Sequence, residues 1–376
     1  MRRDPRANNF DALRIAAALL VVAGHAYILS GRSAAEPLAA HSGVSLGEVG
    51  VSIFFVISGF LVTLSFDRLR AVGPYLKNRC LRILPGLGVA LVLTALALGP
   101  LVSEAPPQTY FAQPQTWLYV LRNLLLYPVD YRLPGVFQHV PYPGAVNGSL
   151  WTLRLEFSFY LVVPLMARLG LLTRPGLAGL AAAAALAFAG ALALGPHVPA
   201  VALLAARNFY LFAAGAALFA WRDARWVRSA TVLVLALAWI VAALVARGLA
   251  PAALYWALPL GVVGVALRPI PGLVQAARFG DLSYGTYIYA FPVQQALMQA
   301  LGPARLGVGG FFLLTVVCVA PLALLSWWGV ERPALRLKRG PGRAVTAAPE
   351  PAQARAGTRG SPPRSGGEAA RAVRPG

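Results

Sequence analysis

Long apolar runs recur along the chain up to about residue 330, and most of them have the length needed to cross a bilayer. A helix needs about 20 predominantly apolar residues to span the hydrocarbon core, because it rises about 1.5 Å per residue. Only 12% of the 376 residues are charged, too few to cover a soluble domain of this length. We therefore expect an all-α fold, a polytopic membrane bundle of about ten transmembrane helices. The predicted spans are roughly residues 10–29, 48–66, 83–102, 150–170, 176–195, 203–221, 229–247, 252–267, 282–300 and 308–330.

The net charge of +20 lies mainly at the ends of these segments and after residue 340. A strongly basic protein often binds nucleic acid, but here the basic residues follow the positive-inside rule, so we expect no nucleic-acid partner. If the N-terminus is inside, segments on that side carry clusters such as Arg222, Arg225 and Arg228, whereas segments on the other side carry mainly single arginines. This asymmetry predicts that both termini are cytoplasmic.

Two segments fall outside the predicted spans. The outer segment at about 103–149 contains a semi-apolar piece, TWLYVLRNLLLYP, which is too short to span and is expected to form a surface or re-entrant helix. Aromatic residues cluster from this segment to Trp151, either as an interfacial belt or as a platform for a sugar or lipid-linked substrate. Residues 340–376 show no periodicity and are rich in Pro, Gly, Ala, Arg and Ser, which predicts a disordered cytoplasmic tail behind a single transmembrane domain at 1–339.

The first span carries two ionisable residues, Arg14 and His25, separated by eleven positions. Eleven steps of about 100° bring both side chains to nearly one helix face, about 16 Å apart along the axis. Arg14 is either an anchor that reaches the headgroups, with Asp11 as a partner one turn away, or a ligand contact. His25 is either a structural histidine or a general base, since an imidazole can take a proton from a hydroxyl.

A basic cluster, Lys77, Arg79 and Arg82, precedes the third predicted span, whose first turn we expect at Pro85. The cluster either sets topology or binds the phosphate groups of an anionic donor such as a coenzyme A thioester, which clustered cations suit.

Glu156 is an acid inside the fourth predicted span, about two turns from its outer end. It either pairs with Arg154 or another buried cation, or orients the imidazole of His25 at similar depth. In the second span, Ser58 and Gly59 are small residues that permit close helix packing. The polar segment 279–295, which includes Tyr287, is expected to line an interior.

Six motifs occur in an order that resembles the acyltransferase 3 family, bacterial integral-membrane O-acyltransferases of envelope glycans. The resemblance covers about residues 8–339, and its motifs are FDALRIAAALLVVAGHA, GVSIFFVISGFLVT, RCLRILP, NGSLWTLRLEFSFY, GDLSYGTYIYAFPV and VERPALRLKR.

The resemblance implies the catalytic arginine and histidine pair of this family at Arg14 and His25, with Glu156 as a further catalytic residue. It implies a cytosolic donor, acyl-coenzyme A and by default acetyl-coenzyme A, and functional positions at Ser58, Arg79, Arg82 and Tyr160. With the nearby Lys77 added, we expect Lys77, Arg79, Arg82 and Ser58 to bind the donor. The implied acceptor is an envelope polysaccharide, lipopolysaccharide or lipid-linked sugar, which we expect Asn147, Trp151, Tyr160 and Tyr287 to contact. The expected location is the inner membrane of a bacterium, and the transfer runs either directly or through an acylated enzyme group.

Two positions depart from the family pattern. Ala290 stands where many relatives have a histidine, and Arg154 alters the charge around Glu156. Some relatives also carry an extracytoplasmic hydrolase-like domain, which we do not expect after residue 339.

A transporter or flippase of a glycan or lipid-linked intermediate is the alternative function. It lacks support from an internal repeat, which transporters often show. Cys80 and Cys318 lie in or near different spans and show no ligand spacing, so no metal is predicted. The sequence does not indicate an oligomeric state.

Overall fold

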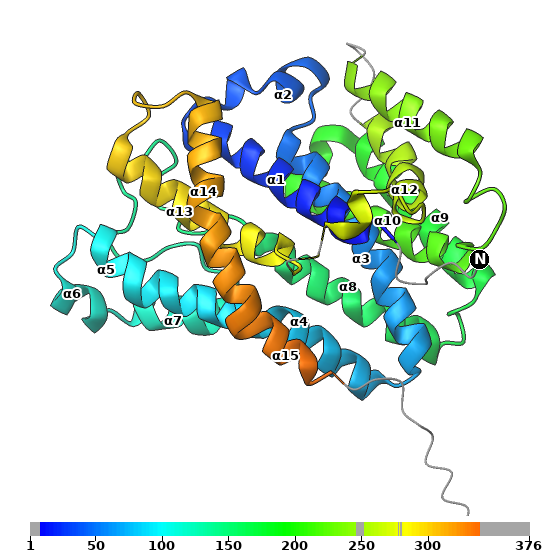
Figure 1. Cartoon of the computed structure of the whole chain (residues 1–376), viewed down its shortest axis with the longest axis horizontal. Coiled ribbons are helices and arrows are strands. Elements are labelled where there is room, and N and C mark those ends of the chain that lie inside the picture. Colours follow the sequence, from blue (N-terminus) through cyan, green and yellow to red (C-terminus); the bar gives the residue numbers. More distant parts are fainter. Residues whose placement is uncertain (1–7, 246–251, 277, 279, 339–376) are drawn as a thin grey trace, which may run out of the picture. The chain divides into compact units, whose positions relative to one another are not determined.

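Helices make up the regular secondary structure of the described chain, apart from one isolated bridge between Ser103 and Val136. The structure is a computed structural model that describes residues 8–245, 252–276, 278 and 280–338. Figure 1 shows the helices in chain order. Their bounds are α1 Phe10–Leu29, η1 Ser33–Ala35, α2 Pro37–Ser42, α3 Leu46–Leu69, α4 Val72–Leu93, η2 Thr94–Leu98, α5 Gly99–Val102, α6 Pro107–Ala112, α7 Pro114–Leu124, α8 Leu150–Arg168, α9 Arg174–Leu194, η3 Gly195–His197, α10 Ala200–Ala220, α11 Ala230–Val245, α12 Ala252–Ala266, η4 Leu273–Gln275, α13 Ser283–Leu301, α14 Val308–Ser326, η5 Trp327–Glu331 and α15 Arg332–Arg336. The expectation of an all-α fold is confirmed for these residues.

Seven helical stretches in the described residues are long and apolar enough to cross a membrane. They are Phe10–Leu29, Leu46–Leu69, Val72–Val102, Leu150–Arg168, Arg174–His197, Ala200–Ala220 and Val308–Arg336. The other three predicted spans coincide with the shorter apolar helices α11 and α12 and with the polar helix α13. The count of ten crossings therefore stays a prediction, whereas a multi-pass membrane bundle is established.

The helix α3 lies at the centre of the bundle and packs against α1, α4, α8, α10 and α12. A capping box begins it: the Ser45 side chain accepts from the Glu48 backbone N–H, and the Glu48 side chain accepts from the Ser45 backbone N–H. Its contact with α10 is close, because Gly59 lies directly against the backbone carbonyl of Phe212 and has no Cβ to prevent it. On the other side, α1 packs against α3 and α13.

The third predicted span begins too late in the sequence. We expected its first turn at Pro85, but α4 begins at Val72 and Pro85 lies inside the helix. The basic residues from Lys77 to Arg82 concealed this start, because a hydropathy pattern excludes charged residues from a span. Arg79 and Arg82 therefore lie on the helix itself and reach the bundle interior.

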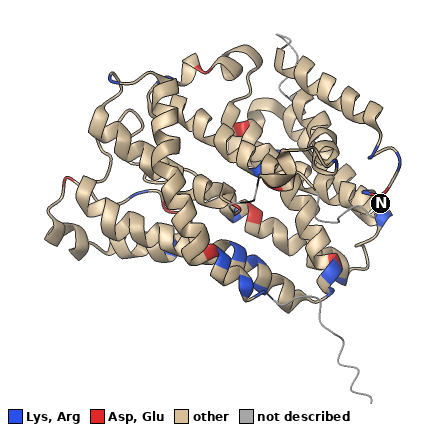
Figure 2. Cartoon of the chain, viewed as in Figure 1, with Lys and Arg blue, Asp and Glu red and all other residues tan. Residues whose placement is uncertain are grey.

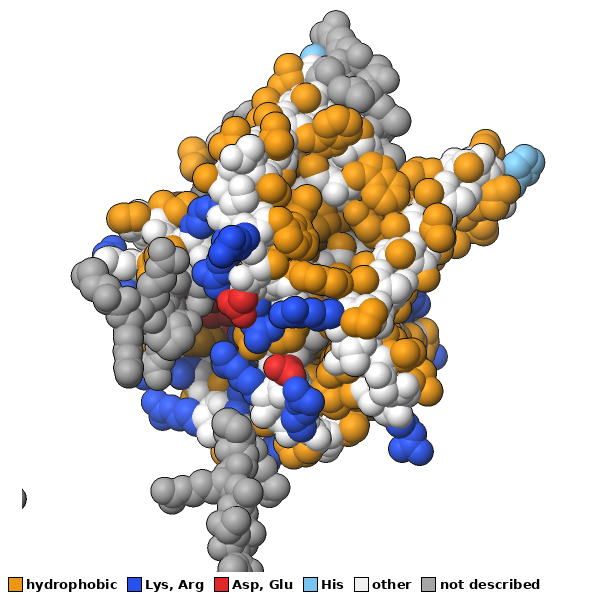
Figure 3. All heavy atoms as spheres, turned by 90° about the vertical axis from the view of Figure 1, so that its right-hand side faces the viewer, with side chains coloured by type: hydrophobic (Ala, Val, Ile, Leu, Met, Phe, Trp, Pro, Cys, Tyr) orange, Lys and Arg blue, Asp and Glu red, His pale blue; other side chains and the backbone are white. Residues whose placement is uncertain are grey.

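Large apolar side chains point outward from several helices, as a lipid environment requires. Leu186 on α9 is 74% exposed, Val234 on α11 is 63% exposed and Val317 on α14 is 68% exposed. Most of each helix carries no charge, and Lys and Arg gather along α4 and at the right-hand ends of the helices (Figure 2). In the space-filling view, hydrophobic side chains cover the upper part of one face, whereas Lys and Arg gather across its lower left (Figure 3). This separation of apolar and basic surface fits a helical bundle in a bilayer.

The segment between α5 and α8 folds beside α4 as two short helices, α6 and α7. The semi-apolar piece predicted as a surface helix is largely α7, which has 11 residues and is too short to span. The predicted tail, 340–376, lies outside the described residues.

Candidate active site

A cavity of about 490 Å³ lies between α1, α3, α4, α8, α13 and the end of the α14–α15 helix. Seven charged residues line it: Asp11, Arg14, Arg79, Arg82, Glu156, Asp281 and Lys338. Apolar residues of α3, among them Phe54, Phe55 and Leu61, form one wall, and Ser58 lies between them. Charge enclosed by membrane helices is costly and usually marks a functional site.

Asp281, in the loop before α13, joins three parts of the bundle. Its Oδ2 accepts from Arg14 Nη1 of α1 at 2.5 Å and from Arg82 Nη2 of α4 at 2.6 Å. Its Oδ1 accepts from the Ser283 hydroxyl at 2.5 Å. Burial alone would raise the pKa of Asp281, but the two guanidinium groups hold the pKa of that carboxyl well below its usual range. Asp281, and not Asp11, is thus the ion-pair partner of Arg14.

Arg82 has a second acidic neighbour on the last helix. Glu331 Oε2 lies 3.8 Å from Arg82 Nη1, and Glu331 Oε1 accepts from the Ser326 hydroxyl at 2.9 Å. Glu331 ends a π-helical turn, Trp327–Glu331, and Trp327 of this turn also lines the cavity. Such turns within α-helices often occur at functional sites.

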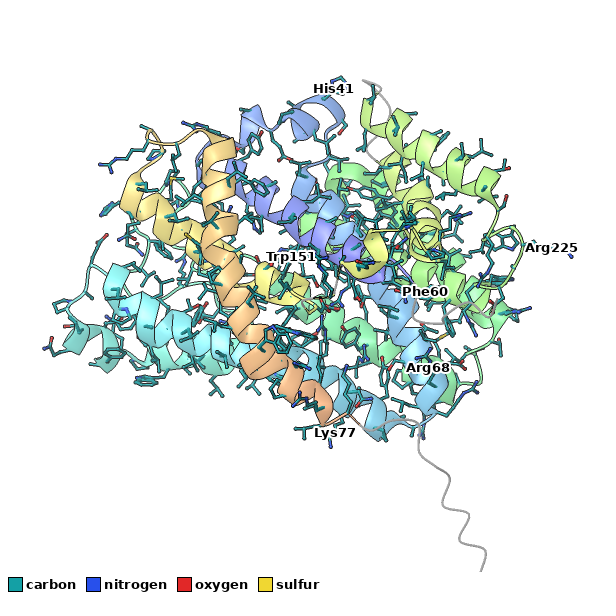
Figure 4. The ribbon with its side chains drawn as sticks, in the orientation of Figure 1. His41, Phe60, Arg68, Lys77, Trp151 and Arg225 are labelled. Carbon is teal, nitrogen blue, oxygen red and sulfur yellow. The ribbon has the colours of Figure 1, made fainter. Side chains whose placement is uncertain are left out.

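Arg79 has only neutral partners among the described residues. Its Nη2 donates to the Ser65 hydroxyl at 3.1 Å, and its guanidinium carbon lies 5.7 Å from the centre of the Tyr160 ring. Its Nε is buried without a hydrogen-bond partner in the described structure. Lys77 lies apart: it is exposed, it does not line the cavity, and Figure 4 shows it at the lower edge of the bundle. The structure therefore does not bring all three predicted donor-binding cations together.

Glu156 of α8 forms a hydrogen-bonded group with Ser58 and Tyr160. The Tyr160 hydroxyl donates to Glu156 Oε1 at 2.5 Å, and the Ser58 hydroxyl donates to the same oxygen at 3.2 Å. The sequence offered Arg154 as an ion-pair partner of Glu156, and this alternative is wrong, since Arg154 lies over the Tyr127 ring at 5.9 Å.

His25 lies further along α1 than Arg14 and faces α13. Its ring meets Phe291 edge to face, with centroids 5.1 Å apart, and its Nδ1 is buried with no hydrogen-bond partner among the described residues. His25 is not part of the cavity lining, and no hydrogen bond joins it to Glu156 in the described chain. The expected contact between these two side chains is therefore absent from the described residues; the partners of Glu156 Oε1 are Ser58 and Tyr160 instead. Arg14 and His25 do share a face of α1, which points into the protein.

The four predicted acceptor contacts fall into two groups. Tyr160 and Tyr287 line the cavity, whereas Asn147 and Trp151 do not. The buried amide of Asn147 joins the loop before α8 to α13, since its Nδ2 donates to the Ile288 carbonyl at 2.9 Å. Tyr287 also ties these elements together, because its hydroxyl donates to the Ser149 carbonyl at 3.1 Å.

Sequence reasoning assigned no role in the cavity to Asp281, Glu331 or Lys338. Asp281 and Glu331 were visible as isolated acids beside the polar helix and the last span, and Arg14 needed an acidic partner. Among the described residues, no group of three His, Cys, Asp or Glu side chains is placed to hold a metal ion.

The fold and the site define a multi-pass membrane protein with a charged cavity enclosed by its helices. The acyltransferase 3 family model, an acyltransferase domain, matches residues 8–330. The chain belongs to this family, and it is an O-acyltransferase.

The chain is similar over most of its length to two relatives. It is 28% identical to the O-acetyl transferase of Shigella phage Sf6 over 345 residues, which cover 87% of this chain and 96% of that protein. It is 31% identical to Nodulation protein 10 of Rhizobium leguminosarum bv. viciae over 370 residues, which cover 88% of this chain and 94% of that protein. Exopolysaccharide production protein ExoZ of Rhizobium meliloti is 33% identical over 120 residues, covering 31% of this chain and 33% of that protein. No solved structure matches the chain significantly.

Proposed function

We propose that the protein transfers an acyl group, by default acetyl, from cytosolic acyl-coenzyme A to a hydroxyl of an envelope glycan or lipid-linked sugar. We further propose that it acts in the inner membrane of a bacterium, with both termini in the cytoplasm and a disordered cytoplasmic tail at 340–376 behind the domain at 1–339. Family membership favours this reading over a transporter or flippase.

One observation carries the donor assignment: at its basic end, the cavity has more cationic side chains than acidic side chains paired with them. Arg14 and Arg82 share the carboxylate of Asp281, while Arg79 lies beside them with neutral partners only. Phosphate groups bind well to such clustered cations. The same cavity continues between apolar side chains of α3, which suit the uncharged arm of coenzyme A.

The position of the basic end supports a cytosolic donor. Arg14 lies near the start of α1, Arg79 and Arg82 lie in the first half of α4, and Lys338 follows the end of α15. With a cytoplasmic N-terminus and alternating spans, all of these points fall on the cytoplasmic side. The positive-inside distribution of Lys and Arg gives the same orientation.

His25 is the proposed general base. Its neighbour Phe291 lies four residues after Tyr287 on α13, and Tyr287 lines the cavity, so one helical turn separates His25 from the cavity wall. The imidazole would accept the proton of the acceptor hydroxyl while the hydroxyl oxygen forms a bond to the thioester carbonyl carbon. The C–S bond then breaks, and the coenzyme A thiolate leaves and takes up a proton. Direct transfer and transfer through an acylated side chain both need this proton acceptor.

The acceptor would enter from the opposite side of the membrane, above His25. Tyr142 of the 103–149 segment also packs edge to face with Phe291, with centroids 6.3 Å apart, and is itself exposed. An aromatic platform there would suit a sugar ring. The relatives include an O-acetyl transferase and an exopolysaccharide production protein, and these names favour a glycan acceptor.

Purified protein supplied with labelled acetyl-coenzyme A and candidate glycans tests the proposal. We expect label to move to a glycan with the wild type. Mass spectrometry of the surface glycan should also show a loss of one acyl unit per repeat when the gene is deleted. Absence of label transfer together with an unchanged glycan mass would refute the proposed reaction.

A further inference from the structure

Lys338 completes the basic end of the cavity, although it lies beyond the last helix. It follows α15 and lines the cavity with Leu335 of that helix and Arg79 of α4. Its ammonium has no hydrogen bond or ion pair within the described chain. It thus comes from a different element than Arg79, and the two side chains face one space.

The four cations at this end divide into two pairs. Arg14 and Arg82 are held by Asp281, and Arg82 also has Glu331 nearby, so both act in joining α1, α4 and α13. Arg79 and Lys338 have no carboxylate within 4.0 Å among the described residues. Like charges gathered without a counter-ion repel each other, and an anion placed between them would relieve this repulsion.

Burial and the neighbouring cations both disfavour the charged form of this lysine. Burial and the neighbouring guanidinium groups of Arg79, Arg82 and Arg14 lower the pKa of Lys338 to about 8, although Asp281 acts in the opposite direction. Asp11, Glu156, Tyr160, Tyr284 and Tyr287 are the other titratable groups that line this cavity. An anion bound at Lys338 would favour its charged form.

We propose that Lys338 and Arg79 bind the phosphate groups of the coenzyme A donor, while Arg14 and Arg82 hold the scaffold and Lys77 takes no part. This inference rests on the proposed donor. A phosphate group is the chemistry recognised, and it has two sources near a membrane surface, the donor and an anionic lipid. Lys338 would then make the affinity for the donor fall as pH rises through about 8.

Kinetics with two thioesters isolate the phosphate contact. Acetyl-coenzyme A carries the phosphates, whereas S-acetylpantetheine has the same thioester without them. We expect Lys338→Met to raise KM for acetyl-coenzyme A about tenfold, the effect of losing one charged contact, with kcat and the use of S-acetylpantetheine unchanged. Lys77→Met is the matched control, an exposed cation on α4 outside the cavity, and should behave as wild type with both donors.

Equilibrium binding provides a readout that does not depend on catalysis. The probe is S-ethyl-coenzyme A, which has no acyl group to transfer and no thiol to titrate, measured by calorimetry between pH 7 and 9. The wild-type Kd should rise across this range, and Lys338→Arg should keep tight binding at pH 9, because its guanidinium stays charged. The proposed function and the binding site can fail separately. If the wild type binds S-ethyl-coenzyme A, Lys338→Met weakens that binding, and the wild type transfers no acetyl group, the proposed function is refuted but the proposed binding site is not.

Three results would overturn the inference. The first is an equal loss with both thioesters in Lys338→Met, and the second is no loss with either thioester. The third is an unchanged Kd for S-ethyl-coenzyme A in Lys338→Met, together with loss of the extra stability that phosphatidylglycerol nanodiscs give the wild type over phosphatidylcholine nanodiscs. That result would assign the site to an anionic lipid.

Discussion

Asp281→Ala should be among the most destabilising single substitutions in the cavity. The substitution removes the carboxylate that accepts from Arg14 and Arg82, whose side chains are only 19% and 11% exposed. Removing one partner of a buried ion pair costs about 3–5 kcal/mol, because the remaining charge stays buried without compensation. Here two guanidinium groups lose their shared partner, so we expect a cost in the upper part of that range.

The assay is unfolding of the purified protein in mixed micelles by sodium dodecyl sulfate, followed by circular dichroism. Asp67→Ala is the matched control, because it removes an aspartate of the same charge whose partner Arg70 is 73% exposed. Exposed pairs contribute about 0–1 kcal/mol. A cost for Asp281→Ala no larger than that for Asp67→Ala would refute the assignment of Asp281 as the junction of three elements.

The pH dependence of this effect has a definite sign. The pKa of Asp281 is depressed in the fold, so its stabilisation is present above the unfolded pKa of about 3.9 and is lost as pH falls through the lower folded pKa. The difference in unfolding free energy between wild type and Asp281→Asn should therefore be constant from pH 5 to pH 6, where Lys338 stays charged.

Three further substitutions test other parts of the account. Gly59→Ala should cost about 1–3 kcal/mol in the same unfolding assay, because its Cβ would overlap the Phe212 carbonyl. The control is Gly73→Ala, whose Cβ would meet no atom within 4 Å and which should stay within about 1 kcal/mol of wild type. Equal costs for the two variants would contradict the close α3–α10 contact. Phe291→Ala should lower the unfolding free energy by about 3–5 kcal/mol and slow acetyl transfer, with an unchanged Kd for S-ethyl-coenzyme A. An unchanged transfer rate would show that Phe291 does not position His25. Arg154→Gln should leave the transfer rate within about twofold of wild type, because Arg154 contacts the Tyr127 ring, a contact that contributes about 0.5–1 kcal/mol. A large loss of rate would indicate that Arg154 acts on Glu156 after all.

The helices were largely predictable from the sequence, because a helix that lies in lipid needs a continuous run of apolar residues. The prediction failed where a helix contains charged residues. Because Lys77, Arg79 and Arg82 lower the hydropathy of the first turns of α4, we placed its start too late, whereas the helix begins at Val72. Helical spacing also placed Arg14 and His25 on one face of α1, since both lie on a single element.

The pairing of charges was beyond reach, because it depends on elements far apart in the chain. Arg14 and Asp281 are 267 residues apart, and nothing in the spacing of either motif specifies that they meet. Glu156 shows the same limit: we expected it at a depth similar to that of His25, but its Oε1 accepts hydrogen bonds from the hydroxyls of Ser58 and Tyr160. Lys338 lay at the border of the predicted tail, where a basic residue is ordinarily read as a topology signal.

The proposed reaction separates donor binding, at the basic end of the cavity, from hydroxyl activation at His25, one helical turn from the cavity wall. Single-turnover acetyl transfer by His25→Ala at saturating acetyl-coenzyme A, with the Kd for S-ethyl-coenzyme A measured on the same preparation, tests it most directly. We expect His25→Ala to bind S-ethyl-coenzyme A with the wild-type Kd and to transfer no acetyl group to glycan. Transfer at the wild-type rate, or loss of transfer only in proportion to lost donor binding, would contradict it.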